Sequence, residues 1–167
     1  MTKLRGFQIV KDEHRQNKKT VQVEQMGVHT LYADIKKPQR GTRKSAGYDF
    51  YLAQDVTLLP AQKTLIWSDI KAYMQEDEYL ALHIRSSLGI KQGIILSNIT
   101  GIIDSDYYEN PDNDGNIGFS LLNTSGRGVE LKAGERVAQG IFQHYLIIDD
   151  DKPLNESREG GIGHSGR

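Results

Sequence analysis

The chain has 167 residues, a length typical of one domain, and 37% of them are hydrophobic. With 21 basic and 22 acidic residues the formal net charge is -1, so the chain has no basic excess that would bind the phosphates of nucleic acid. The absence of cysteine excludes disulfides, zinc–thiolate sites and a thiol nucleophile. No apolar run approaches about 18 residues and the first ten residues have no apolar signal core, so we expect no membrane association and a cytoplasmic location.

The predicted elements are strands rather than helices. Residues 11–27 are charged and rich in glutamine, and we expect a solvated loop or an inserted hairpin there. Leucine and isoleucine occupy every second position in residues 79–84, and shorter β-favouring runs follow at 117–121 and 129–131. The best helix candidate, residues 12–26, is mostly polar. We therefore predict an all-β fold, a jelly roll or distorted β-barrel.

The C-terminal end differs in composition from the rest of the chain. We expect a single β-barrel domain over residues 1–150 and a glycine-rich arm over residues 151–167. Four of the last eight residues are glycine, so the arm lacks the side chains needed to order itself. Two alternatives stay open: a disordered end, or a segment that folds over a bound molecule.

Three motif matches fail on their context. The spacing Gly161-x-Gly163-x-x-Gly166 imitates a dinucleotide fingerprint, but the chain ends one residue later and no helix can follow. Residues 110–115 imitate the start of an EF-hand loop, yet position 12 is Leu121 where calcium needs a bidentate glutamate. The five histidines are scattered without metal-ligand spacing.

Two short stretches carry chemistry. Residues 85–89, Arg-Ser-Ser-Leu-Gly, combine a guanidinium, two hydroxyls and a glycine, which together suit an anion, although an ordinary turn at a strand end has the same composition. In residues 101–107, Asp104 follows an Ile-Ile pair that looks buried. Burying an ionised carboxylate is energetically unfavourable, so its presence there indicates a functional role. We interpret Asp106 as the structural twin of Asp104, paired and uninvolved in the chemistry, and Tyr107 as a flat face for stacking on a sugar or base.

Taken together, the motifs resemble those of the trimeric dUTP pyrophosphatases (dUTPases), in the family's order from about Pro38 to Arg167. The five matching segments are residues 45–53, 85–89, 98–107, 134–139 and 158–166. The resemblance implies a dUTPase-type jelly roll assembled as a homotrimer. It also implies hydrolysis of dUTP to dUMP and pyrophosphate, by in-line attack of water at the α-phosphorus, with Mg²⁺ as cofactor.

The resemblance assigns roles to individual residues. Asp104 is the general base that orients the attacking water, and Tyr107 packs against the deoxyribose and rejects ribonucleotides. Asp49 orders the water shell of a Mg²⁺ ion that the triphosphate itself coordinates. Asn98 and backbone groups near Gly101 and Ile103 are expected to contact uracil, and Ile162 is expected to form an aliphatic lid over the base. The residues expected to contact the phosphates are Arg85, Ser86, Ser87, Gly89, Gln139, Arg158 and Ser165.

Three features depart from the family pattern. Residues 108–114 lengthen the segment after Tyr107, where a glycine usually follows within about two residues, and Pro111-Asp112 is suited to a turn there. The tail lacks one residue between Arg158 and Gly160 relative to the common pattern. Ile162 replaces the usual phenylalanine, which removes a stacking contribution of about 0.5–1.5 kcal/mol.

Two alternative functions remain. A dCTP deaminase-like relative shares the fold but needs a catalytic glutamate shortly after the third motif, whereas Glu109 lies in the insertion. A nucleotide-sensing trimer that regulates a protein partner is the other alternative, with residues 11–27 and 108–114 as the surfaces for docking.

Overall fold

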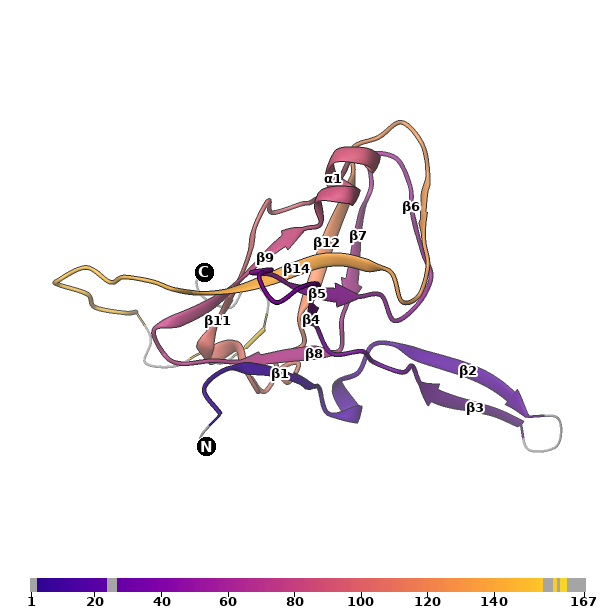
Figure 1. Cartoon of the computed structure of the whole chain (residues 1–167). Helices are drawn as coiled ribbons and strands as arrows, with labels where there is room; N and C mark the ends of the chain where they lie inside the picture. The colour runs from indigo at the N-terminus through magenta and orange to yellow at the C-terminus, as the bar shows by residue number, and fades with distance from the viewer. Residues whose placement is uncertain (1–2, 24–26, 155–157, 159, 162–167) are drawn as a thin grey trace.

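The structure is a computed structural model that describes residues 3–23, 27–154, 158, 160 and 161 (Figure 1). Within these residues it contains fourteen strands, one α-helix and two 3-10 turns. The helical elements are η1 (Asp12–His14), α1 (Ser86–Gln92) and η2 (Ser105–Tyr107). The strands are β1 (Gly6–Ile9), β2 (Lys18–Val23), β3 (Gly27–Tyr32), β4 (Gln39–Arg40), β5 (Tyr48–Tyr51), β6 (Val56–Leu58), β7 (Lys63–Trp67), β8 (Ile70–Tyr73), β9 (Glu78–Ile84), β10 (Ile94–Leu96), β11 (Gly101–Asp104), β12 (Gly118–Asn123), β13 (Val129–Leu131) and β14 (Arg136–His144).

Two sheets organise the body of the molecule. The larger has the order β11-β9-β14-β5-β4 and the smaller has the order β10-β12-β7, and every pairing in them is antiparallel. Shorter pairs, β1 with β8 and β6 with β13, extend this arrangement. The all-β class predicted from the sequence is confirmed, and β9, β12 and β13 coincide with the three predicted β runs.

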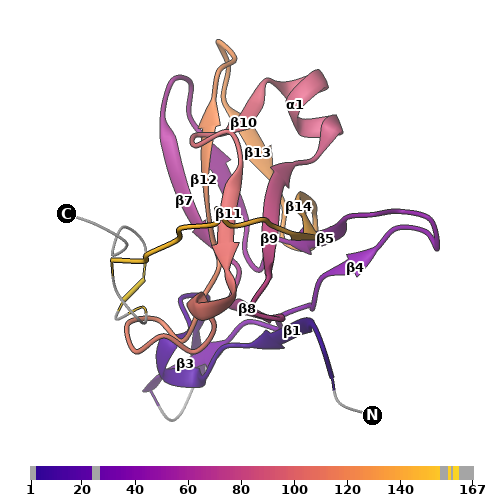
Figure 2. The same cartoon turned by 90° about the vertical axis from the view of Figure 1, so that its left-hand side faces the viewer.

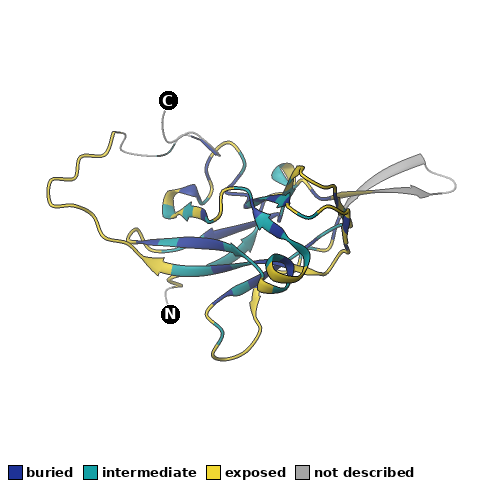
Figure 3. Cartoon of the chain, turned by 90° about the horizontal axis from the view of Figure 1, so that it is seen from above, coloured by how far each residue is buried: buried dark blue, intermediate teal, exposed yellow. Residues whose placement is uncertain are grey.

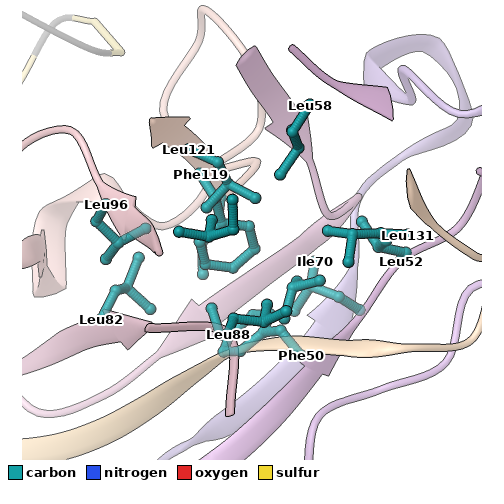
Figure 4. Packing of buried hydrophobic residues seen from close by; sticks show 14 of the residues in the cluster. Phe50, Leu52, Leu58, Ile70, Leu82, Leu88, Leu96, Phe119, Leu121 and Leu131 are labelled. Carbon is teal, nitrogen blue, oxygen red and sulfur yellow. The ribbon is translucent and has the colours of Figure 1, made fainter. Parts of the chain in front are cut away.

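The core lies where the two sheets face each other (Figure 4). Leu80 and Leu82 of β9 are buried, as the alternating pattern predicts, and Phe119 and Leu121 of β12 meet them from the smaller sheet. The rings of Phe50 and Phe119 pack edge to face with centroids 5.2 Å apart. Burial of each such side chain contributes roughly 1.5–3 kcal/mol, so this layer fixes the spacing of the two sheets.

Helix α1 is the one α-helix among the described residues, and it occupies the stretch expected to be a turn. Its seven residues include Gly89, so the sequence carries too little helical periodicity to detect it. Leu88 anchors the helix in the core, and Gly93 ends it in the left-handed conformation at φ 68°. Among the described residues, no helix has the length and apolar character needed to span a bilayer.

The segment at residues 11–27, for which a loop or hairpin was expected, contributes η1 and part of a hairpin. Strands β2 and β3 pair from Lys18↔Tyr32 to Val23↔Gly27 and project away from the body (Figure 1). Figure 3 shows the burial of the body itself, with buried residues concentrated on the strands. The base of the hairpin is tied to the body by Asp69, a fully buried carboxylate that accepts hydrogen bonds from the backbone N–H groups of Gln16 and Asn17, each at 2.9 Å. The hairpin therefore emerges from a fixed point.

Candidate active site

A cavity of about 500 Å³ opens where β11 of the larger sheet faces β12 of the smaller one. Its walls are apolar toward the core and polar at the mouth, the division expected of a site that takes a ligand with a flat base and a charged end. The residues that line it are Leu65, Leu82, Leu96, Ser97, Asn98, Gly101, Ile102, Ile103, Asp104, Tyr107, Gly118, Phe119, Ser120, Arg158 and Gly161.

The predicted base-binding residues share this cavity. Gly101 begins β11 opposite Leu82, and a Cβ atom at that position would lie 3.1 Å from the Leu82 side chain, so glycine permits the close approach of the two strands. Asn98 lies exposed in the turn before β11, and Ile103 packs partly against the core. The backbone between Leu96 and Gly101 therefore forms the rim of the cavity.

Asp104 ends β11 at the mouth of the cavity, with its side chain half exposed. Partial burial raises the pKa of this carboxyl above its usual value, the charge of Asp106 raises it further, and the charge of Arg158 opposes both. Arg158 forms an ion pair with Asp104 and another with Asp106, the latter with 2.9 Å between Nε and Oδ1. A single arginine from the arm thus bridges the two carboxylates.

Tyr107 is held rigidly in the wall. Its hydroxyl donates to the backbone oxygen of Asn116 at 2.9 Å and accepts from Nδ2 of Asn113 at 2.8 Å. Burial raises the pKa of the Tyr107 hydroxyl, so the group stays protonated and keeps donating at neutral pH. The guanidinium of Arg158 lies 5.7 Å from the ring centroid. The ring is therefore fixed as a flat surface beside Asp104.

The inserted residues 108–114 form an ordered turn rather than a loose loop. Asn110 donates to the backbone oxygen of Tyr107 and to the side chain of Asn113, each at 2.8 Å. The buried amine of Lys71 binds both oxygens of the buried Asp114 carboxylate, at 2.9 and 3.0 Å, and lies 2.9 Å from Oε1 of Glu109. Burial alone would lower the pKa of Lys71, but these two carboxylates raise it. The insertion is thereby fastened to β8.

Five of the predicted phosphate-binding residues form a separate group outside this cavity: Arg85, Ser86, Ser87, Gly89 and Gln139. Arg85 pairs with Asp49 at 3.2 Å between Nε and Oδ1, and Arg136 holds the other oxygen of Asp49 at 3.1 Å. Gln139 lies opposite Asp49 in the pairing of β14 with β5. Ser86 and Ser87 open helix α1, while the N–H of Gly89 is already bonded to the backbone oxygen of Arg85 at 3.0 Å.

The two groups lie at opposite ends of β9. Asp104 pairs with Tyr79 near the start of that strand, and Arg85 follows directly after its end. Arg85 lies six residue steps along the extended chain from Tyr79, which corresponds to about 20 Å. One chain therefore does not bring Asp104 and Arg85 to the same phosphorus atom.

The residues present do not fit a cation held by the protein. The residues that the structure describes contain no group of three or more histidine, cysteine or acidic side chains suited to a metal ion. Both oxygens of Asp49 accept from guanidinium groups, an environment that favours anions over a directly bound cation. The role of Asp49 in a water shell stays a prediction.

Some site residues were missed by sequence reasoning, and two predicted ones cannot be placed. Ile162 and Ser165 lie outside the described residues, whereas Arg158 lies in the cavity wall. The bridging partner Asp106 was expected to be uninvolved, and Asn113 was not singled out. The cluster of asparagine and aspartate at residues 110–114 is a turn signal that could have indicated such a scaffold.

Comparison with known proteins agrees with the resemblance. The sequence model of the dUTPase family matches residues 33–166. The deoxyuridine 5'-triphosphate nucleotidohydrolase of Lactococcus lactis is 43% identical over 135 residues, which span 80% of this chain and 90% of the relative. The enzyme of the same name from Idiomarina loihiensis is 36% identical over 140 residues, with 80% and 89% covered.

Solved structures give the same answer. The crystal structure of dUTPase from Streptococcus mutans is 37% identical, covers 86% of this chain and 98% of its own, and superposes with a TM-score of 0.70. The dUTPase from phage phi11 of S. aureus, at 17% identity and TM-score 0.65, covers 92% and 97% and shares the fold. The expected dUTPase-type jelly roll is confirmed, and the chain belongs to the dUTPase family.

Proposed function

We propose that this protein hydrolyses dUTP to dUMP and pyrophosphate by in-line attack of water at the α-phosphorus. The observation that carries the proposal is the convergence of Asn98, Asp104 and Tyr107 on one cavity with an apolar interior and a charged mouth. Family membership supports the overall reaction, and the geometry of the cavity supports the individual roles.

The base and sugar occupy the interior in this proposal. The backbone of β11 and the side chain of Asn98 offer hydrogen-bonding groups to the edge of uracil, while Phe119 and Leu96 provide apolar walls. The ring of Tyr107 lies against the deoxyribose. Because two hydrogen bonds fix its hydroxyl, the ring cannot move aside to admit a 2'-hydroxyl group.

Asp104 holds and deprotonates the attacking water. A carboxylate at the mouth of the cavity is accessible to both water and a phosphate chain, and its raised pKa strengthens it as a base at neutral pH. Arg158 forms ion pairs with Asp104 and Asp106 in this structure, and during catalysis it exchanges these carboxylates for phosphate oxygens of the substrate. The base is then free for catalysis only when a triphosphate is bound.

The phosphate-binding groups come from a neighbouring copy, and we propose a homotrimer for this reason. The spacing of about 20 Å along β9 supports this, because Arg85, Ser86 and Gln139 of one chain lie too far from its own Asp104. The segment after β14 supports it too: Leu146 is 99% exposed, and Ile147 and Ile148 are also exposed. Such an apolar run needs a covering surface.

A Mg²⁺ ion would be held by the triphosphate itself in this proposal. It would supply positive charge that offsets the charge of the phosphate chain, so the protein would need no cation cage of its own. The proposed roles of Asp104, Tyr107 and Asn98 do not depend on which protein groups contact the water shell of the ion.

Deamination of dCTP is the less favoured reaction. The glutamate nearest to the third motif is Glu109, and its carboxylate is held by the Lys71 amine at 2.9 Å, away from the residues that line the cavity. A regulatory role toward a protein partner has one supporting observation, the projecting β2–β3 hairpin (Figure 1). Capture of a partner by the wild type but not by a variant lacking residues 18–32 would support that role.

Pyrophosphate release from dUTP, dTTP, dCTP and UTP with Mg²⁺ tests the proposal. We expect turnover of dUTP alone, and a loss of about 10²–10⁴-fold in kcat for Asp104→Asn, the usual contribution of a general base. Robust turnover by Asp104→Asn would overturn the assignment of the base. Ammonia from dCTP would support the deaminase instead.

Mixing inactive variants tests whether the site is shared between copies. Asp104→Asn and Arg85→Gln remove opposite halves of the site, so trimers reassembled from both should contain some sites with two intact halves and regain activity. A mixture of Asp104→Asn with Tyr107→Ala, which damage the same half, is the control and should stay inactive. No recovery in the first mixture, once exchange of subunits is verified, would refute the shared site.

A further inference from the structure

The C-terminal arm contacts the segment after β11 at two points, one in η2 and one in the inserted loop, residues 108–114. In Figure 2 the last described residues of the chain lie beside the turn that follows β11. Arg158 pairs with Asp106, at 2.9 Å between Nε and Oδ1. Three residues further along, the backbone N–H of Gly161 donates to Oδ2 of Asp112 at 3.2 Å. Gly160 and Gly161 are buried by this docking, and Arg158 and Gly161 line the cavity. The arm therefore lies at the cavity while its Gly161 is hydrogen-bonded to Asp112 of the inserted loop.

The loop is rigid enough to act as a platform. Asn110 accepts hydrogen bonds from the backbone N–H groups of Asp112 and Asn113, at 3.1 and 3.2 Å, and so fixes the backbone that carries both. The ion pair between Asp114 and Lys71 fastens the end of the same turn to β8. Asp112 is exposed, yet the backbone beneath it is held from both sides.

The contact surface also fits glycine at position 161. A Cβ atom there would lie 3.3 Å from Oδ2 of Asp112, closer than most Cβ contacts, so the carboxylate would have to shift by a few tenths of an ångström. The distance to Nδ2 of Asn113 would be 3.4 Å, an ordinary van der Waals contact. A side chain at position 161 would therefore displace the acceptor of the Gly161 N–H group.

We propose that Asp112 is a positioning residue that seats the C-terminal arm at the mouth of the cavity, so that the inserted residues 108–114 serve as the docking platform of the arm. This inference rests on the proposed function for its kinetic consequence, but not for the docking itself. Asp112 touches neither the cavity nor the reacting atoms and acts through the position of Gly161.

Steady-state kinetics of full-length Asp112→Ala and Asp112→Asn test the kinetic consequence. The alanine variant removes the acceptor, and we expect KM for dUTP to rise about tenfold, the effect of losing one hydrogen bond to a charged group. The asparagine variant keeps an oxygen acceptor and should stay within about twofold of the wild type. Asp149→Ala, a change at an exposed carboxylate outside the loop, is the matched control and should leave KM unchanged. An unchanged KM in Asp112→Ala would overturn the proposal.

Limited digestion with trypsin tests the docking without nucleotide. Trypsin cleaves after Arg158 but not after Lys152, because Pro153 follows that lysine. Loss of residues 159–167, followed by intact mass, should be several times faster in Asp112→Ala than in the wild type or in Asp112→Asn. Equal rates would overturn the docking. Should the wild type fail to hydrolyse dUTP, the proposed function fails while this measurement still decides the docking.

A double-mutant cycle separates docking from a structural effect of either change. Gly161→Pro removes the N–H group that donates a hydrogen bond to Asp112. Asp112→Ala should therefore raise KM much less in the Gly161→Pro background than in the wild type. Additive effects of the two changes would show that Asp112 acts through some other contact and would refute the proposal.

Discussion

The ion pair between Arg5 and Glu78 ties the N-terminal segment to the first residue of β9, next to the point where β9 pairs with Asp104. The carboxylate of Glu78 is buried and accepts from Nε of Arg5, with 3.0 Å to each of its oxygens, from Nη2 of Arg5, and from the backbone N–H of Gln75 at 3.2 Å. The hydrogen bond from Arg5 is the main cause that lowers the pKa of Glu78 from 4.5 to about 2.

The magnitude follows from linkage between protonation and folding. A carboxyl whose pKa falls from 4.5 in the unfolded chain to about 2 in the folded one contributes up to about 3 kcal/mol at neutral pH. Because the Arg5 side chain is 39% exposed, solvent screens the pair, and we expect about 2 kcal/mol. The folded pKa is the lower one, so this stability is present above pH 4.5 and is lost as the pH falls through about 2.

Urea unfolding of Glu78→Gln and of the wild type, at pH 7 and pH 3 and at one protein concentration, measures this contribution. We expect the variant to be less stable by about 2 kcal/mol at pH 7 and the difference to shrink by more than half at pH 3. Glu130→Gln, a change at an exposed glutamate of β13, is the control and should stay within about 0.5 kcal/mol at both pH values. A difference for Glu78→Gln that is absent, or independent of pH, would refute the reasoning.

Two further predictions concern the charges around the cavity. The charge of Asp106 raises the pKa of Asp104 and the charge of Arg158 lowers it. The acid limb of the pH profile of kcat/KM should therefore move to lower pH in Asp106→Asn and to higher pH in Arg158→Ala. Shifts of the two variants in the same direction would contradict this reasoning. Lys71→Met should lower the free energy of unfolding by about 3 kcal/mol, since it leaves the buried Asp114 carboxylate with only the largely exposed Lys11 amine, at 3.8 Å, as a charged partner. Urea unfolding with a loss below about 1 kcal/mol would disprove it.

The parts of the fold that the sequence predicts are those with a local pattern. Residues 79–84 alternate because one face of β9 meets the core, and for the same reason residues 118–121 and 129–131 of the other two runs lie on β12 and β13. Helix α1 escaped detection because seven residues with a glycine in the middle complete only two turns. Its stability comes from the burial of Leu88, a tertiary contact that no local pattern records.

The candidate site was predictable where the family motifs carry it and unpredictable where distant residues meet. Asn98, Asp104 and Tyr107 do share a cavity, as the resemblance implies. The contacts of Arg158 with Asp106 and of Gly161 with Asp112 join residues 52 and 49 positions apart, and they depend on how η2 and the turn at 108–114 fold. Periodicity and spacing carry no information about such pairs.

The length of strand β9 sets the distance between Asp104 at one end of the strand and Arg85 at the other. Its first residues are fastened by Arg5 and carry the register that places Asp104, while its last residue leads into Arg85 and α1. Since both ends are fixed by packing, the span of about 20 Å cannot close by a local movement of one chain. The proposed reaction needs both ends at one phosphorus, so under that proposal a second copy has to supply one of them.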